Sequence, residues 1–318
     1  MTDQQRIRLG IIGLGAMGTE MLDIAHQHPD FEVVAAADPN PTALERIRAQ
    51  HPDISLGHSA APLLDSARLD AIYIASPPGT HAGYAIAAMS AGKAVLSEKP
   101  LAVRLSDGAE MVHVAAATGM VNALNFTLSD RAAALAVGQA LRDGEPGDIV
   151  GVDMGFTFPS WPRPFQRDAR WVAGREQGGL LREVGSHYLF LTDHLLGPLT
   201  PASTHIRYGT AAETFAAGQF TAGDIPINIT GRVAAAPETY EWTLYGTERS
   251  FRITDWSRLH ISDGGQWTEV TPSGPRGTEH TRLSAFARAI RGQHSALPDF
   301  ATGLRVQQAI EHFHQASS

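Results

Sequence analysis

The sequence predicts an α/β protein, with a doubly wound parallel sheet in its N-terminal part and a mostly antiparallel sheet in its C-terminal part. From Arg6 to Phe126, short β-branched or Ala-rich runs alternate with helix-length amphipathic stretches. From Ala202 to Val270, short alternating segments are separated by Gly, Pro and Asp turns. At 318 residues the chain is long enough for two domains, which we expect at residues 1–123 and 124–318.

The N-terminal pattern predicts five parallel strands joined by crossover helices. Asn40 followed by Pro41 is typical of a helix start, and Gly92 and Gly119 are typical helix ends. The expected strands are Arg8–Ile12, Glu32–Ala37, Ala71–Ala75, Ala94–Ser97 and Val121–Asn125.

After Asn125 the rhythm changes. We expect a helix around Arg131–Leu141, a strand at Ile149–Phe158 and a helix that begins near Gly179. The antiparallel segments follow, and two helices close the chain. Their apolar stripes are Leu283, Phe286, Ala287 and Ile290 in the first, and Val306, Ile310 and Phe313 in the second.

Composition argues against several classes of function. The formal net charge of -8, without a block of like charges, disfavours binding to nucleic acid or to an anionic membrane surface. The chain has no cysteine, which excludes disulfides, thiolate zinc sites and cysteine nucleophiles. Its 14 histidines show no convergent ligand spacing, so we expect no metal. The polar start and the lack of a long apolar stretch predict a cytoplasmic protein.

A glycine motif lies between the first expected strand and the first helix. Gly13, Gly15 and Gly18 follow the GxGxxG pattern, in which the backbone turn and the helix N-terminus bind a pyrophosphate. Asp38 ends the second strand 20 residues after Gly18, where a ribose-binding acid is expected. Its charge would repel the extra phosphate of NADP, which favours NAD while leaving NADP possible. The alternative is an ordinary glycine turn and a helix-capping aspartate. The residues expected to contact the dinucleotide here are Gly13, Leu14, Gly15, Ala16, Met17, Gly18 and Asp38.

Three further residues are candidates for catalysis. Lys99 follows a strand of the doubly wound sheet, at the edge where ligands bind, although a solvated loop lysine would have the same spacing. Glu183 and His187 are four residues apart on one helix, so the carboxylate can orient the imidazole as a general base. The alternative for this pair is core packing.

Longer motifs resemble one family. The SPPGTH loop at residues 76–81, AGKAVLSEKPLA at 91–102 and GGLLREVGSHYLFLTDHLLGP at 178–198 are similar to motifs of the Gfo/Idh/MocA (glucose–fructose oxidoreductase / inositol dehydrogenase) family. The resemblance implies a Rossmann domain followed by an α+β domain with a large open sheet, and substrate held between them beside the nicotinamide. It also implies a cis Lys99–Pro100 bond and a homodimer or homotetramer formed through the C-terminal sheet.

The same resemblance implies roles for individual residues. Lys99 would polarise the reacting oxygen, and the cofactor would also contact Ser76, Pro77, Pro78, His81, Glu98 and Lys99. The chain departs from the family twice, because Glu183 replaces the usual Asp and Phe190 stands where a substrate-binding Asp is usual. A phenylalanine accepts no hydrogen bond from a hydroxyl, so a highly hydroxylated substrate would lose a partner there.

The loop at residues 160–175 is rich in tryptophan and arginine. We expect Trp161, Arg163 and Trp171 to bind substrate together with Lys99, Glu183 and His187, with aromatic faces against sugar-like rings. Arg167 and Arg170 are further candidates in the same loop. An aromatic plug at the domain interface is the alternative.

These features together predict an oxidoreductase that interconverts a secondary alcohol and a ketone on a sugar, polyol or related cyclic compound. Other members of the same class would be an NAD-dependent, redox-assisted glycosidase or an imine or carbonyl reductase. A non-catalytic nicotinamide-binding regulator is the alternative from another class. Lys99 and the Glu183–His187 pair argue against the regulator, since binding alone needs none of them.

Overall fold

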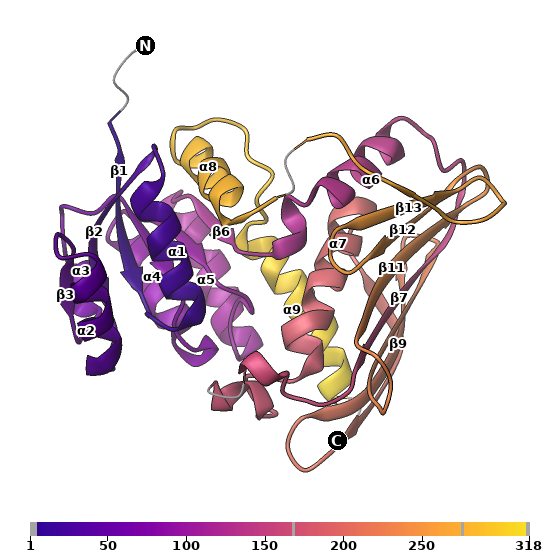
Figure 1. The fold of residues 1–318 in the computed structure, drawn as a ribbon, viewed down its shortest axis with the longest axis horizontal. Helices are drawn as coiled ribbons and strands as arrows, with labels where there is room; N and C mark the ends of the chain where they lie inside the picture. The colour runs from indigo at the N-terminus through magenta and orange to yellow at the C-terminus, as the bar shows by residue number, and fades with distance from the viewer. Residues whose placement is uncertain (1–4, 167–168, 275–276, 316–318) are drawn as a thin grey trace. The chain divides into compact units, whose positions relative to one another are not determined.

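The computed structural model describes residues 5–166, 169–274 and 277–315. The chain forms two compact units, residues 1–126 with 278–304 and residues 127–277 with 305–318 (Figure 1). This differs from the expected contiguous division at 123/124, because helix α8 (Glu279–Ile290) belongs to the first unit. Its Phe286 stacks on Phe31 with ring centroids 6.4 Å apart. An apolar stripe shows that a helix packs on something, but not on which sheet.

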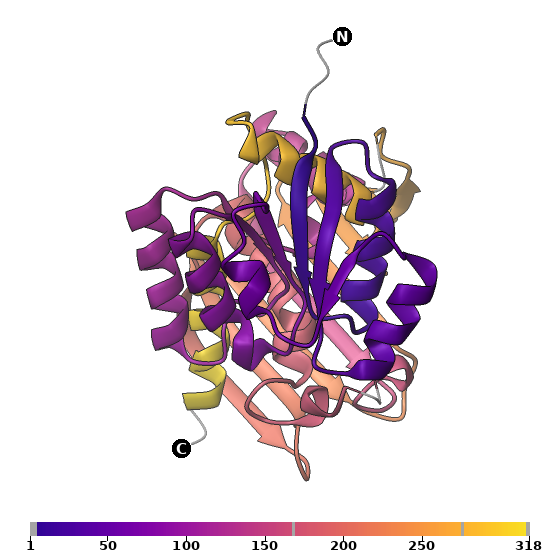
Figure 2. The same cartoon turned by 90° about the vertical axis from the view of Figure 1, so that its left-hand side faces the viewer.

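The first unit is built on a parallel sheet in the order β3-β2-β1-β4-β5-β6. Helices lie on both sides of this sheet (Figure 2), as the predicted doubly wound fold requires. Its strands are β1 Ile7–Ile12, β2 Phe31–Ala37, β3 Ser55–Gly57, β4 Ala71–Ile74, β5 Ala94–Ser97 and β6 Asn122–Leu124. Its other helices are α1 Ala16–Gln27, α2 Pro41–Gln50, α3 Ala61–Leu64, the short 3₁₀ turn η1 Pro78–Thr80, α4 His81–Ser90 and α5 Leu105–Thr118.

The expected strands of this unit are confirmed to within one residue at each end. Strand β3 was not predicted, because three residues at a sheet edge are too short to show an alternating pattern. Asn40 caps α2 as expected, accepting a hydrogen bond from the Thr42 backbone N–H at 3.0 Å. Gly119 ends α5 in the left-handed conformation.

The second unit contains a sheet in the order β14-β13-β12-β11-β7-β10-β9-β8. Its neighbouring strands pair antiparallel, except for the parallel pair β7 and β10, so the predicted mostly antiparallel sheet is confirmed. The strands are β7 Ile149–Phe158, β8 Thr200–Tyr208, β9 Glu213–Ala222, β10 Ile225–Val233, β11 Thr239–Gly246, β12 Ser250–Thr254, β13 Arg258–Ser262 and β14 Thr268–Val270.

Helices cover one face of this sheet (Figure 1). The Trp242 indole N–H donates to Thr192 Oγ1 at 2.9 Å, and Phe156 stacks on Tyr188, which fixes helix α7 on strands β11 and β7. The helical segments are η2 Thr127–Ser129, α6 Ala132–Arg142, η3 Pro164–Gln166, η4 Arg170–Ala173, α7 Ser186–Leu196 and α9 Phe300–Gln315, which crosses the division at residue 304. In the described part of the chain, no helix combines the length and apolar character needed to cross a membrane.

The segment before α7 corrects the expectation of one continuous α-helix from Gly179. Residues Leu181–Gly185 form a π-helical turn, and α7 begins only at Ser186. Gly179 has a φ of +96°, and a Cβ there would lie 1.9 Å from Glu213 Oε2. The same carboxylate accepts a hydrogen bond from the Leu180 backbone N–H at 2.9 Å. Glu213 on β9 therefore holds the start of this segment, and Gly179 leaves room for it.

Glu213 also makes the stability of the protein depend on pH. Burial raises the pKa of Glu213 from 4.5 to about 6, against backbone hydrogen bonds and the charges of Arg182 and Arg175, which lower it. Since the folded state holds this proton more tightly than the unfolded state, the resulting stability is present below pH 4.5 and lost as the pH rises through 6.

We expect Glu213→Gln to remove this pH dependence. Between pH 4.5 and about 7 the free energy of unfolding of the wild type should fall by about 2 kcal/mol relative to that of the variant, measured by urea denaturation at each pH. Glu248→Gln, at an exposed position after β11, is the matched control and should keep the wild-type profile. Parallel pH profiles for the wild type and Glu213→Gln would contradict the assignment.

Candidate functional site

The carboxyl ends of β1, β2, β4 and β5 lie along one edge of the parallel sheet, and the expected cofactor residues follow them. Gly13 has a φ of +96°, and a Cβ there would lie 2.6 Å from the backbone of Ala75. A Cβ on Gly18 would lie 1.9 Å from the Gly13 carbonyl oxygen. A Cβ on Gly15, by contrast, would meet no atom of the described residues within 4 Å beyond its immediate chain neighbours and its own helix. The first and third glycines are therefore required by the protein itself, whereas Gly15 faces open space.

The start of α1 fits a dinucleotide pyrophosphate. Gly15 is the N-cap residue and supplies no side-chain hydrogen bond to the helix. Gly15, Ala16 and Met17 are exposed, so the first turn of the helix presents backbone N–H groups to an incoming anion. Leu14 is buried and belongs to the core.

Asp38 is held at the end of β2 by two backbone donors. Its Oδ2 accepts from Leu14 N at 2.7 Å and its Oδ1 from Asn40 N at 2.8 Å. Arg46 on α2 reaches the same turn, where its Nη2 donates to Leu14 O at 2.9 Å and to Thr19 Oγ1 at 3.1 Å. Sequence reasoning did not place Arg46 at this site. The available signal was its position on the second turn of the helix that follows Asp38.

The loops after β4 and β5 are joined by a buried histidine. His81 Nδ1 lies 2.8 Å from Pro100 O, and its Nε2 lies 2.8 Å from Ser76 O. Burial lowers the pKa of His81, and in the neutral form the ring donates to one of the two carbonyls at a time. The Lys99–Pro100 bond is cis, as the resemblance implied. The buried His81 ring therefore joins the loop after β4 to the loop that carries Lys99.

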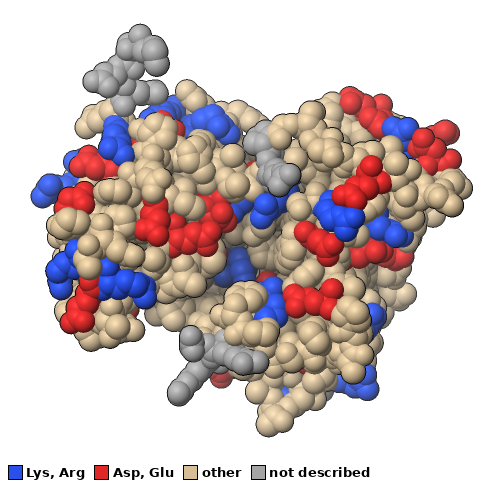
Figure 3. All heavy atoms as spheres, viewed as in Figure 1, with Lys and Arg blue, Asp and Glu red and all other residues tan. Residues whose placement is uncertain are grey.

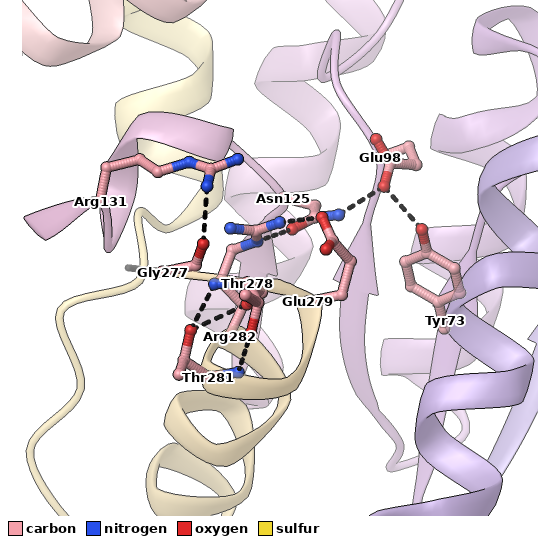
Figure 4. Close-up of polar contacts among 9 residues, drawn as sticks. All are labelled: Tyr73, Glu98, Asn125, Arg131, Gly277, Thr278, Glu279, Thr281 and Arg282. Atoms are coloured by element: carbon pink, nitrogen blue, oxygen red, sulfur yellow. Dashed lines mark hydrogen bonds and ion pairs between the residues drawn. The ribbon is translucent and has the colours of Figure 1, made fainter. Parts of the chain in front are cut away.

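Glu98 points away from the loop into a buried polar network (Figure 4). Its Oε1 accepts from Tyr73 Oη and from Asn125 Nδ2, each at 2.6 Å. Burial raises the pKa of Glu98, while these hydrogen bonds and the charges of Lys99 and Arg282 oppose the rise. Glu98 is thus a support of the loop that carries Lys99.

In the second unit, His187 is buried at the start of α7. Trp256, in the turn after β12, packs edge-on against the His187 ring with centroids 5.2 Å apart, and also contacts Tyr240. Trp256 adopts a φ of +68°, which is rare for a bulky side chain. Sequence reasoning missed Trp256, because Asp255 indicates the turn but nothing in the sequence indicates that the next residue meets His187.

Glu183 lies in the π-helical turn and is buried. Its Oε2 accepts from Gln166 Nε2 at 2.9 Å, and Gln166 Oε1 accepts from Arg163 Nε at 2.9 Å. Arg163 Nη1 in turn donates to Tyr240 Oη at 3.2 Å. The π turn breaks the α-helical geometry from which the Glu183–His187 pairing was inferred, so that pairing stays a prediction. Gln166 was not foreseen.

Part of the aromatic loop at residues 160–175 packs against the eight-stranded sheet of the second unit. Trp161 packs against Phe158, and its indole N–H donates to Val172 O at 3.2 Å. Arg163 lies over the Phe165 ring at 4.7 Å, and Trp171 is half-buried. Arg167 lies outside the described residues, and Arg170 begins the short helix η4.

Two residues that follow His187 on α7 are engaged in contacts within the protein. Phe190 is fully buried and stacks on His194 with centroids 5.6 Å apart. Asp193 forms a bidentate ion pair with Arg305, its Oδ2 2.7 Å from Nη2. Because Asp193 is engaged by Arg305, it is not a ready replacement for the substrate-binding Asp whose place Phe190 takes.

The candidate residues thus form two groups. Lys99 and the cofactor residues belong to the first unit, whereas Glu183, His187 and the aromatic loop belong to the second. Acidic and basic side chains are interspersed over the face shown in Figure 3. Within residues 5–166, 169–274 and 277–315, no three His, Asp or Glu side chains gather in a group that could hold a metal ion.

Curated relatives cover most of the chain. A dTDP-3,4-didehydro-2,6-dideoxy-alpha-D-glucose 3-reductase from Streptomyces violaceoruber is 29% identical over 94% of this chain and 85% of its own length. The enzyme of the same name from Streptomyces antibioticus is 30% identical over 78% and 75%, respectively. The scyllo-inositol 2-dehydrogenase (NADP(+)) IolW from Bacillus subtilis is 24% identical over 92% and 71%.

Solved structures share the fold. The WlbA dehydrogenase from Bordetella pertussis, in complex with NADH and UDP-GlcNAcA, has a TM-score of 0.84 at 23% identity, covering 98% of this chain and 96% of its own. KijD10, a 3-ketoreductase from Actinomadura kijaniata in complex with NADP and TDP-benzene, has a TM-score of 0.82 at 21% identity, covering 98% of both chains.

Family models match both parts of the sequence. Residues 7–126 match the model of an oxidoreductase family with an NAD-binding Rossmann fold, and residues 134–252 match the GFO/IDH/MocA C-terminal domain. With the glycine turn, the parallel sheet and the open C-terminal sheet in place, the chain belongs to the Gfo/Idh/MocA family of NAD(P)-dependent oxidoreductases.

Proposed function

We propose that the protein interconverts a secondary alcohol and a ketone on a sugar, with Lys99 and His187 as its catalytic residues. The observation that carries this proposal is that both chain neighbours of Lys99 are held: the Pro100 carbonyl lies 2.8 Å from the buried His81 ring, and the Glu98 carboxylate accepts from Tyr73 and Asn125. A lysine in a merely solvated loop needs no such support. The family membership and the sugar-reductase names of its relatives support the reaction class.

In the oxidation direction, Lys99 donates a hydrogen bond to the reacting oxygen, and His187 takes the proton of the hydroxyl. The carbon–hydrogen bonding pair leaves as hydride, and the carbon–oxygen double bond forms. A nicotinamide cofactor held by the residues of the glycine turn would accept or supply that hydride. Glu183 is buried near the start of α7, where we propose that it positions His187. Reduction follows the same steps in reverse.

For the substrate we propose a sugar with few hydroxyls at the reacting end, carried on a nucleoside diphosphate. Relatives that act on a dTDP-linked dideoxy sugar support this class. Phe190 also supports it, because the apolar side chain offers no acceptor for a sugar hydroxyl. Trp256 beside His187 is a suitable surface for the apolar face of a sugar ring.

We also propose that two or four copies assemble through the open face of the eight-stranded sheet. The register places small and polar side chains of β7 on the face opposite the buried Phe156, namely Gly151, Asp153, Gly155 and Thr157. A flat face of this kind suits a symmetric contact between copies. A cytoplasmic location stays a prediction.

Lys99→Ala and His187→Ala should each lower kcat by about 10²–10⁴-fold, because each removes a group that acts on the reacting oxygen or its proton. Their Kd for NADH, measured by fluorescence titration, should stay within about twofold of the wild type. The activity assay follows absorbance of the reduced nicotinamide over a panel of dTDP- and UDP-sugars, aldoses and inositols.

The controls are Lys93→Met and His113→Ala, which remove a lysine and a histidine at other positions, both in the first unit. Normal turnover in both Lys99→Ala and His187→Ala would place the active site elsewhere. A wild type that binds NADH but turns over no member of the panel would favour the non-catalytic regulator.

Asp38→Asn should move cofactor preference toward NADP. The change keeps the shape of the side chain and removes the charge that repels the 2′-phosphate, and Arg46 is close enough to the turn to receive it. The ratio of the Kd for NADP to the Kd for NAD should fall about tenfold or more. Asp53→Asn, at an exposed position, is the control, and adding Arg46→Met should reverse part of the gain. An unchanged ratio would contradict the proposal that Asp38 lies beside the cofactor ribose.

Trp161→Ala distinguishes the two interpretations of the aromatic loop. If the ring contacts substrate, KM for the sugar should rise about tenfold or more while the Kd for NADH stays constant. Trp267→Ala, which removes a tryptophan near β14, is the control. An unchanged KM with lower thermal stability would identify Trp161 as packing for β7.

A further inference from the structure

Arg282 on α8 is completely buried in the first unit. Its Nε donates to Asn125 Oδ1 at 2.6 Å, and its Nη2 pairs with Glu279 one turn earlier on the same helix (Figure 4). A buried guanidinium is destabilising unless its hydrogen bonds are satisfied. Arg282 places a charged group beside the core residues Leu283 and Phe286, where packing alone would call for an apolar side chain.

The bond from Arg282 decides which way the Asn125 amide faces. Because the Asn125 oxygen accepts from Arg282, its Nδ2 must point the opposite way, toward Glu98 Oε1 at 2.6 Å. A flipped amide would bring two donors together at Arg282 and two acceptors together at Glu98. Tyr73 Oη donates to the same Glu98 oxygen from strand β4. Glu98 is therefore fixed by a chain of hydrogen bonds that starts at Arg282, which lies 157 residues after Asn125 in the sequence.

Arg282 also balances the carboxylates around it. Burial raises the pKa of Glu98 and of Glu20 on α1, and the charge of Arg282 opposes both rises. The third carboxylate is Glu279, which pairs with Arg282 directly. Without the guanidinium, Glu98 would lose the fixed Asn125 donor and a compensating positive charge together. The residue that follows Glu98 is Lys99.

We propose that Arg282 is a positioning residue for the reaction, which acts through Asn125 and Glu98 to hold Lys99 in its working place at the end of β5. This inference rests on the proposed function in one respect, the catalytic role of Lys99. It adds that a helix from the far end of the chain, folded back onto the first unit, completes the support of the catalytic loop. Arg282 itself touches neither substrate nor cofactor in this role.

The chain allows a direct measurement, because Lys93 and Lys99 are its only lysines. Reductive methylation with formaldehyde and cyanoborohydride, followed by peptide mass spectrometry, gives the labelling rate of each amine separately. In Arg282→Met the Lys99 rate should rise about threefold or more relative to Lys93, because the loop gains freedom. Arg291→Met is the matched control, since it removes the ion pair that Arg291, just after α8, forms with Asp30, and should leave the ratio unchanged.

Two further variants keep the test sound if Arg282→Met folds poorly. Tyr73→Phe removes one Glu98 donor without leaving a buried charge, and should raise the ratio in the same direction by a smaller factor. Arg282→Lys keeps the charge but has one nitrogen in place of three, so it cannot reach Asn125 and Glu279 with separate nitrogens, and its ratio should fall between those of Arg282→Met and the wild type. A ratio that is unchanged or lower in both Arg282→Met and Tyr73→Phe would overturn the proposal.

Two readouts separate this inference from the proposed function. Protection of Lys99 by NADH in the wild type tests whether the lysine lies at the cofactor, whatever Arg282 does. With an active substrate, Arg282→Met should lower kcat about tenfold or more with the Kd for NADH within about twofold of the wild type. A purely structural role would lower thermal stability in Arg282→Met and Arg291→Met alike and leave kcat and the labelling ratio in place.

Discussion

The approach of β1 to β4 is the constraint on which the first unit depends. Where β1 ends, the chain turns at Gly13 so close to Ala75 that no side chain fits, and Gly18 then rests on the Gly13 carbonyl. These two contacts set α1 against the sheet with its first turn exposed. The same edge receives Asp38 from β2 and the loops that follow β4 and β5. A parallel sheet places all these strand ends together, so that a single tight turn organises a whole binding edge.

Local patterns were sufficient for much of the fold. The glycine motif, the Asn40–Pro41 helix start and the alternating strand runs involve residues close in sequence, so their physical causes are visible without the structure. These patterns do not show which part of the molecule an element packs against. The stripe of α8 predicts a helix, but only packing reveals that Phe286 meets Phe31 in the first unit. The π-helical turn before α7 also escaped prediction, as did the hydrogen bond just before it, from Leu180 to Glu213 on β9, which joins residues far apart in the sequence.

The candidate site shows the same difference between residues that local motifs indicate and residues that only tertiary contacts reveal. A family-like motif nominated Lys99 and Glu98 as site residues, because they occur together in the short segment AGKAVLSEKPLA. Their supports, Tyr73, Asn125 and Arg282, come from three other segments, and each taken alone is an ordinary tyrosine, asparagine or arginine. Trp256 and Gln166 escaped prediction for the same reason, since their importance arises from contacts with His187 and Glu183. Sequence patterns indicate chemical groups more readily than the residues that hold them.

Both units use a buried carboxylate to hold the segment that bears a candidate catalytic residue. Glu98 directly precedes Lys99 and is tied to β4, to the end of β6 and, through Asn125, to α8. Glu213 accepts the N–H of Leu180 at the start of the segment that leads through Glu183 to His187. In each case burial raises the carboxyl pKa and hydrogen bonds oppose the rise. Burying each carboxylate therefore costs stability, while its hydrogen bonds fix the position of the neighbouring backbone. A glycine or a cis proline stands beside each carboxylate, at Gly179 and at Pro100, where the backbone departs from regular structure. If Lys99 and His187 act on the reacting oxygen and its proton as we propose, these supports serve the reaction, because hydride and proton transfer tolerate little misplacement of the reacting groups.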